Sequence, residues 1–205
     1  MIISPEPMSA PDIYKLMTGI VVPRPIAWIT TLSADGVLNL APFSCFTFVS
    51  SKPPMVGFNC GLRNGQRKDT SINIEATGDF VVNIGDDSMI EQVHRSALDF
   101  PPDISEVAEL GLDSLPSQRV KTPRLSHAPI SMECRFSQKI EFGETGAEFI
   151  VGEVLLFHIR DGLCNNNKID TATLRPICRI GGPNYATLSD IISMQHVGDV
   201  RTGPS

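Results

Sequence analysis

The residues from 130 to 159 constrain the fold most strongly. Apolar and polar residues alternate between Ile130 and Ser137, which is the period of a strand with one buried face. The segment Gly143–Gly146 predicts a turn, and Phe149–Ile159 predicts a long apolar return strand. These residues therefore predict an antiparallel hairpin.

The remaining chain predicts more strands and a few short helices. Strands are expected at 21–31, 37–40, 46–50, 55–60 and 80–84. Helices are expected from Ser9 to a stop at Gly19, from Asp69 or Thr70 to Gly78, and over 88–98, with mostly loop over 99–125. Because regular strand–helix–strand alternation is absent, the sequence predicts a mainly β fold, a β-barrel with short helices.

Composition and chain organisation exclude several classes of protein. Hydrophobic residues make up 41% of the 205 residues, which excludes disorder of the whole chain. No repeat or linker divides it, so we expect a single domain over residues 1–205, with a core at about 14–190 and a loose C-terminal tail. The net charge of −6 argues against nucleic acid or an anionic membrane as a partner.

The cysteines and histidines indicate compartment and metal content. The five cysteines are scattered and form no C-x-x-C pair, so we expect a cytoplasmic protein with free thiols. The four histidines show no zinc-site spacing, and no metal site is expected. Neither a secretory signal nor an apolar segment long enough to span a membrane is expected.

A cationic segment before the predicted helix at 69–78 is the first candidate site. Arg63, Arg67 and Lys68 lie close to the helix N-terminus, and Thr70 adds a hydroxyl donor. Cations at a helix N-terminus favour a bound phosphate group. The alternative is that Asp69 caps the helix while Arg67 and Lys68 are solvated.

The segment Asn39–Ser44 is the second candidate site. A proline, small residues and polar groups lie there between two apolar runs. Such a segment allows a flat ligand to approach the backbone. The alternative is a bulge at a barrel corner. Rossmann, P-loop and G-x-S-x-G motifs are all absent from the sequence.

Several stretches together resemble a known family. The sequence is similar to the flavin reductase-like family with the FMN-binding split-barrel fold, in particular to its flavoredoxin-like branch. The resemblance runs from about Tyr14 to Asp190 and rests on residues 23–31, 39–44, 68–70, 73–78, 174–176 and 179–182 with Tyr185.

The resemblance implies a six-stranded Greek-key barrel that forms a homodimer with FMN near the subunit interface. It implies that Thr30 and Thr31 lie along the ribityl chain or the phosphate. It places the isoalloxazine ring beside the main chain of Asn39, Ala41, Pro42, Phe43, Ser44 and Cys45. It assigns the phosphate to Lys68, Asp69 and Thr70, together with Arg63 or Arg67.

The leading hypothesis for function is an FMN flavoprotein oxidoreductase. The resemblance implies NADH or NADPH as electron donor, and flavin, ferric iron or a partner protein as acceptor. The compact phosphate site without a Gly-rich loop predicts FMN and not FAD. No side chain needs to act as acid or base, so no catalytic residue is assigned, and His158 is expected to be structural.

Two other functions remain open at the level of sequence. The first is an FMN-binding electron carrier or sensor without NAD(P)H activity. The second is a dimeric binding module that has lost its flavin, against which the intact motifs at Thr30-Thr31, 42–44 and 68–70 argue.

Overall fold

The computed structural model describes residues 1–194, so the last part of the predicted C-terminal tail lies outside the described residues. The helices are α1 (Ala10–Ile20), α2 (Asp69–Thr77), α3 (Ile90–Arg95), α4 (Glu106–Glu109) and α5 (Thr171–Leu174), with a 3₁₀ turn at Asp87–Met89. The longer strands are β2 (Ala27–Leu32), β3 (Leu38–Phe43), β4 (Phe46–Ser51), β5 (Pro54–Cys60), β6 (Asp79–Ile84), β9 (Ile130–Phe142) and β10 (Ala147–Ile159). The short strands are β1 (Arg24–Pro25), β7 (Ser114–Leu115), β8 (Arg124–Leu125), β11 (Cys164–Asn165), β12 (Lys168–Ile169), β13 (Ile177–Arg179) and β14 (Tyr185–Thr187).

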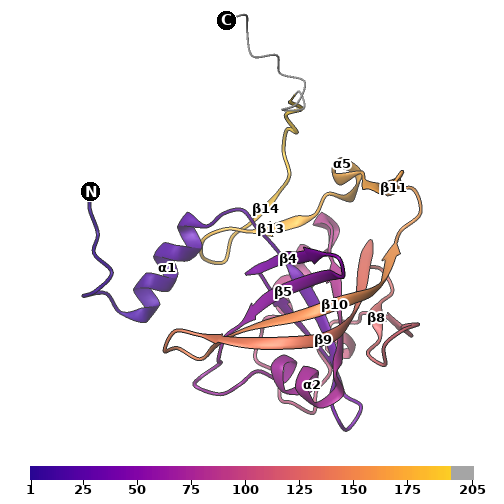
Figure 1. Ribbon diagram of the computed structural model, residues 1–205, viewed down its shortest axis with the longest axis horizontal. Helices are drawn as coiled ribbons and strands as arrows, with labels where there is room; N and C mark the ends of the chain where they lie inside the picture. The colour runs from indigo at the N-terminus through magenta and orange to yellow at the C-terminus, as the bar shows by residue number, and fades with distance from the viewer. Residues whose placement is uncertain (195–205) are drawn as a thin grey trace, which may run out of the picture.

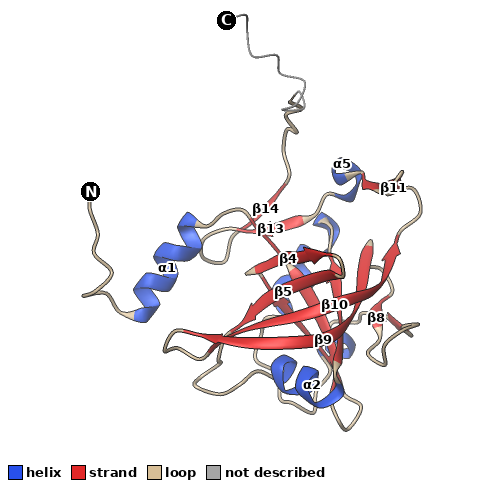
Figure 2. Ribbon diagram, in the orientation of Figure 1, coloured by secondary structure: helices blue, strands red, loops and turns tan. Residues whose placement is uncertain are grey.

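Seven antiparallel strands form one curved sheet in the order β3-β2-β6-β9-β10-β5-β4 (Figure 2). The order β6-β9-β10-β5 is a Greek key, because the long β9–β10 hairpin lies between two strands that are consecutive in the chain. β3 and β5 approach each other across the barrel, where the rings of Phe43 and Phe58 lie 4.8 Å apart. The chain passes from β3 to β4 through Ser44 and Cys45, and the Cys45 carbonyl accepts a hydrogen bond from the Asn59 amide at 2.8 Å, one residue beyond the β4–β5 ladder.

The structure confirms the mainly β barrel and corrects some details. The main sheet has seven strands, not six, because β4 pairs along β5 and continues the sheet. The expected strand over 21–31 divides, since β1 pairs with β13 in a separate sheet. Residues 38–43 form a regular strand, so the alternative of a bulge at 39–44 is wrong. The helix expected over 88–98 is a 3₁₀ turn followed by the shorter α3.

Two apolar clusters bury both faces of β2. Ile29 points into the barrel with Phe58 and Phe80. The side chain of the preceding residue, Trp28, points to the opposite face of the strand and packs outside the barrel among residues of α3 and α4. Its Nε1 donates to Ser96 Oγ at 2.8 Å. The outer cluster therefore attaches the helices to the β2–β3 side of the barrel.

The short helix α4 covers part of the free edge of β3. Glu106 accepts a hydrogen bond from the Leu40 amide at 2.9 Å, and Ser105 donates to the Leu38 carbonyl at 2.6 Å. Burial raises the pKa of Glu106, an effect that the Leu40 amide partly offsets. These hydrogen bonds satisfy the free edge of β3 at residues 38–40. Pro42 lies further along the same edge, where the strand has no partner and the missing amide of proline costs no ladder hydrogen bond.

Figure 1 shows α2 at one end of the barrel and the β13–β14 pair at the other, with α1 to the side. None of the residues of α1 is buried. Within the described chain, no helix combines the length and apolar character needed to cross a membrane.

Gly152 in β10 lets the core ring of Phe80 lie against the strand. A Cβ atom at Gly152 would lie 2.4 Å from Phe80 Cζ and 3.2 Å from the Arg135 carbonyl oxygen. We expect Gly152→Ala to destabilise the protein by roughly 1–3 kcal/mol through overpacking. Thermal unfolding followed by circular dichroism measures this change. The matched control is Gly61→Ala, because a Cβ there meets nothing within 4 Å, and this variant should unfold at the wild-type temperature.

Candidate functional site

The two candidate segments of the sequence meet along β3. Asn39, near its start, contacts α2 through Thr70, and Ser44, just beyond its end, contacts β1 through Arg24. Five residue steps of extended chain lead from Asn39 to Ser44, a distance of about 17 Å. The site is therefore elongated, with the start of α2 at one end and the β1–β13 region at the other.

A buried polar cluster joins β2, β3 and α2. Asn39 Nδ2 donates to Thr31 Oγ1 and to Thr70 Oγ1, both at 3.2 Å. Asn73 Nδ2 donates to Thr31 Oγ1 at 3.1 Å. Both threonine hydroxyls thus accept hydrogen bonds, and within residues 1–194 neither finds an acceptor for its own proton. Buried donors of this kind favour an additional acceptor at the site.

Asn73 was not identified from the sequence as a site residue. It lies three positions after Thr70 in α2, so both residues occupy one face of the helix. That spacing was the signal available in the sequence.

Thr30 lies apart from this cluster. It is fully buried, and its hydroxyl donates to the Pro123 carbonyl at 2.8 Å. Neighbouring residues of a strand point to opposite faces, so Thr30 faces the outer cluster while Thr31 faces α2. The structure therefore brings Thr31 to the candidate site and leaves Thr30 outside it.

The three cations of the first segment have different surroundings. Arg63 forms an ion pair with Asp99 at 2.7 Å. Lys68 has no carboxylate within 4.0 Å among the described residues, and its Nζ lies 5.1 Å from the centre of the Phe43 ring. Burial, together with the charge of Arg63, lowers the pKa of Lys68 below its ordinary value. Lys68 is therefore a partly buried cation without a local counter-charge.

Arg67 belongs to an ionic network on the other side of α2. It pairs with Glu75 at 2.7 Å and with Glu148 at 3.2 Å, and it donates to Ser71 at 2.7 Å. Burial opposes the charge of Glu148, but hydrogen bonds from Lys139 and Ser71 outweigh it and hold the pKa of this carboxyl low. The network ties α2 to the β9–β10 hairpin and neutralises Arg67.

The N-terminus of α2 is not capped by Asp69, which was the alternative to a phosphate site at this segment. Lys68 occupies the N-cap position and makes no side-chain cap hydrogen bond, whereas Asp69 is the first helical residue. The side chain of Asp69 makes no hydrogen bond or ion pair within the part of the chain that the structure describes. The interpretation of Asp69 as the cap is therefore wrong, and no side chain satisfies the first-turn amides.

The second segment presents alternate residues to two environments. Ala41 and Phe43 are buried and point into the barrel, so any ligand there meets them through the main chain. Pro42 and Ser44 line a cavity of about 380 Å³ outside the barrel. Cys45 is exposed, and its carbonyl accepts a hydrogen bond from the Asn59 amide, one residue beyond the β4–β5 ladder.

Arg24, Arg179 and Tyr185 are among the lining residues of this cavity that were not identified from the sequence as site residues. Arg24 Nε donates to Ser44 Oγ at 3.3 Å, and Arg179 Nη1 donates to the Tyr185 hydroxyl at 2.5 Å. They come from β1, β13 and β14, so only the pairing of these strands brings them together.

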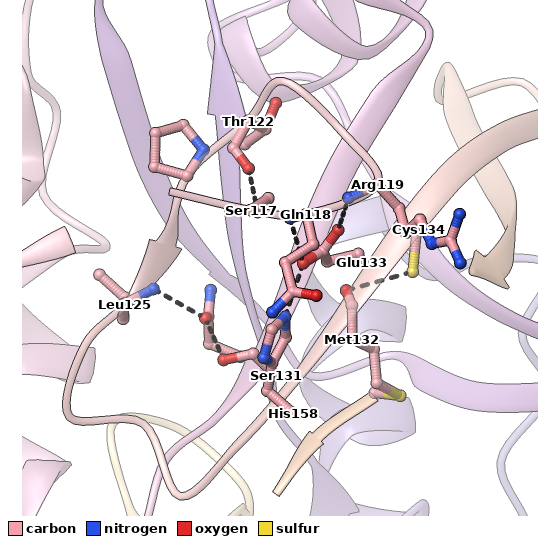
Figure 3. A network of polar contacts seen from close by, with 12 residues as sticks. Ser117, Gln118, Arg119, Thr122, Leu125, Ser131, Met132, Glu133, Cys134 and His158 are labelled. Atoms are coloured by element: carbon pink, nitrogen blue, oxygen red, sulfur yellow. Dashed lines mark hydrogen bonds and ion pairs between the residues drawn. The ribbon is translucent and has the colours of Figure 1, made fainter. Parts of the chain in front are cut away.

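His158 belongs to a network of polar contacts around Glu133 (Figure 3). Its Nε2 is 2.6 Å from Glu133 Oε1, and Glu133 also accepts the amides of Gln118 and Arg119 at 2.9 and 2.6 Å. Burial opposes the charge of Glu133, but these hydrogen bonds keep its pKa below the usual value. His158 makes no hydrogen bond to the predicted site residues, which agrees with the structural role expected for it.

Comparison with known proteins gives a consistent result. The model of the flavin reductase like domain matches residues 18–172. An uncharacterised protein of Halalkalibacterium halodurans is 37% identical over 199 residues, which cover 95% of each chain. An uncharacterised protein of Bacillus subtilis is 37% identical over 191 residues, covering 90% of this chain and 93% of that one.

Two solved structures are similar over almost their entire length. Nitrilotriacetate monooxygenase component B from Bacillus cereus has a TM-score of 0.92 and 34% identity, covering 95% of this chain and 98% of that one. The 2-nitrobenzoate 2-nitroreductase of Pseudomonas fluorescens has a TM-score of 0.89 and 30% identity, and the match covers 100% of each chain. Flavoredoxin of Desulfovibrio vulgaris, at 17% identity and a TM-score of 0.75, shares the fold, with 87% of this chain and 93% of that chain covered.

Proposed function

Because the chain belongs to the flavin reductase like domain family, we propose that it is an FMN-binding oxidoreductase that takes electrons from NADH or NADPH. The proposed acceptor is free flavin, ferric iron or a partner protein. The similar component B is part of a monooxygenase, and this supports a partner protein as acceptor.

The observation that carries this proposal is the environment of Lys68. A partly buried cation without a carboxylate partner is costly unless an anion is bound. Lys68 lies at the N-terminus of α2, where unpaired amides also attract anions. Thr70, in the first turn, has a hydroxyl proton available. This set of donors fits the phosphate of FMN.

The remainder of the site fits the shape of FMN from phosphate to ring. In the proposed arrangement the ribityl chain follows β3 from the polar cluster at Thr31 and Asn39. The ring then lies at residues 41–45, beside the main chain of Ala41 and Phe43. FMN, when bound, supplies the redox chemistry of such proteins. The protein contributes charge neutralisation at Lys68, orientation along β3 and access to the cavity beside Ser44.

The proposed activity is tested with the purified protein. Acid extraction should release FMN as the main flavin, because the site has one phosphate-binding end and no Gly-rich loop for a second phosphate. Anaerobic addition of NADH or NADPH should then bleach the absorbance of the oxidised flavin. A spectrum that stays oxidised with both donors would identify an electron carrier or sensor, and FAD as the main extracted flavin would contradict the cofactor assignment.

Lys68→Ala tests the phosphate site directly. Its charge-assisted hydrogen bond is worth about 1.5–3 kcal/mol, so the variant should bind FMN roughly tenfold to a hundredfold more weakly. Riboflavin lacks the phosphate and should bind to wild type and variant equally. Fluorescence titration of flavin into flavin-free protein measures both affinities.

Arg67→Ala is the matched control for this experiment. Arg67 is adjacent to Lys68 but is neutralised by Glu75 and Glu148, so its loss should leave FMN affinity near the wild-type value. If Lys68→Ala binds FMN as tightly as wild type does, the phosphate site must be sought elsewhere.

The proposed functional unit is a homodimer. Tyr14 of α1 is 68% exposed and Phe48 of β4 is 76% exposed, as are other large apolar residues on these elements, and a second subunit would cover such surface. Light scattering should give twice the 22.3 kDa mass of the chain. Phe48→Glu should favour the monomer, whereas Thr47→Glu on the other face of β4 should not; a wild-type mass of one chain would refute the dimer.

A further inference from the structure

The cavity beside Pro42 and Ser44 has an unusual charge composition. Its volume is about 380 Å³, at the lower end of the range for small-molecule sites. Three basic residues, Lys15, Arg24 and Arg179, line it, and the lining contains no aspartate or glutamate. Its apolar wall includes Ile26 and Pro42, so charge and flat apolar surface are adjacent.

Arg24 places a buried positive charge in the wall. The residue is only 6% exposed. It donates to the carbonyls of Thr18 at 2.5 Å, Val21 at 2.7 Å and Ile180 at 3.2 Å, and to Ser44 Oγ at 3.3 Å. All these partners are neutral, so they satisfy its hydrogen bonds but leave its charge without a counter-ion.

Arg179 adds a second guanidinium group, which keeps a donor nitrogen without a hydrogen-bond partner among the described residues. Its Nε donates to the Gly182 carbonyl at 3.0 Å and its Nη1 to the Tyr185 hydroxyl at 2.5 Å. The guanidinium lies 4.6 Å from the centre of the Tyr185 ring, and the Tyr185 hydroxyl is also 3.1 Å from His94 Nδ1. The group is thus held in place, while its Nη2 makes no hydrogen bond to residues 1–194.

We propose that this cavity binds a small planar organic carboxylate, with its carboxylate on Arg179 and its apolar body against Ile26 and Pro42. A fixed, planar guanidinium is suited to recognising a carboxylate, and the uncompensated charge of Arg24 strengthens the attraction. The position of this ligand next to the flavin ring rests on the proposed function. Its binding to the cavity does not require flavin.

The test compares benzoate with benzamide, its neutral analogue, by calorimetric titration of the flavin-free protein. Benzoate should bind about tenfold to a hundredfold more tightly than benzamide, as expected for charge-assisted hydrogen bonds, and added salt should weaken benzoate binding alone. Arg179→Gln should lower benzoate affinity by a similar factor and leave benzamide affinity unchanged. The matched control is Arg135→Gln, which removes the same charge from an exposed pair with Glu153 and should bind benzoate like wild type.

Several results would overturn the inference. Equal affinities for benzoate and benzamide refute the inference, because charge then has no role in binding, and this comparison needs no variant. Unchanged benzoate affinity in folded Arg179→Gln refutes it as well. Binding of NADPH that depends on Arg179, without binding of benzoate, would make the cavity a dinucleotide site. Titration of FMN into the same flavin-free protein separates this inference from the proposed function. If the protein binds benzoate but does not bind FMN, only the proposed function is contradicted.

Discussion

The packing of the Phe43 ring on the Phe58 ring inside the barrel is the interaction that positions the candidate site. β3 and β5 are not neighbours in the sheet, so this contact joins strands that are far apart in the strand order. It holds the end of β3 against β5 and places the Phe43 ring beneath the amine of Lys68. β3 therefore leads from the start of α2, where Asn39 meets Thr70, to β1, where Ser44 meets Arg24.

The free edge of β3 is divided between a structural and a functional part. A free edge offers unpaired backbone groups that natural proteins usually cover. Here Ser105 and Glu106 satisfy the carbonyl of Leu38 and the amide of Leu40. The next outward position is Pro42, which has no amide to satisfy, and beyond it the cavity begins. The cover thus ends where a ligand would need access to the strand.

The basic side chains near β3 fall into the same two groups, one structural and one functional. Arg63 and Arg67 are neutralised by carboxylates of the chain itself, and such pairs hold elements together. Lys68 and Arg24 are largely withdrawn from water yet have no carboxylate partner among the described residues. The folded chain bears that electrostatic cost at two places, at Lys68 over the Phe43 ring and at Arg24 beside Ser44. Bound anions at these places would offset it, and both proposals made above rest on this observation.

Sequence patterns alone predict the strands of the β9–β10 hairpin, the end of α2 at Gly78 and the two segments of the candidate site. Local preferences decide these features: alternation of apolar residues, and a glycine that takes positive φ at the helix end. Only the tertiary structure decided which cation lacks a partner, because Asp99 and Glu148 reach Arg63 and Arg67 from distant parts of the chain. It likewise separated Thr30 from Thr31 and joined Arg24 to Arg179. Charge pairing and burial depend on residues far apart in sequence, and a pattern within a short segment carries no information about them.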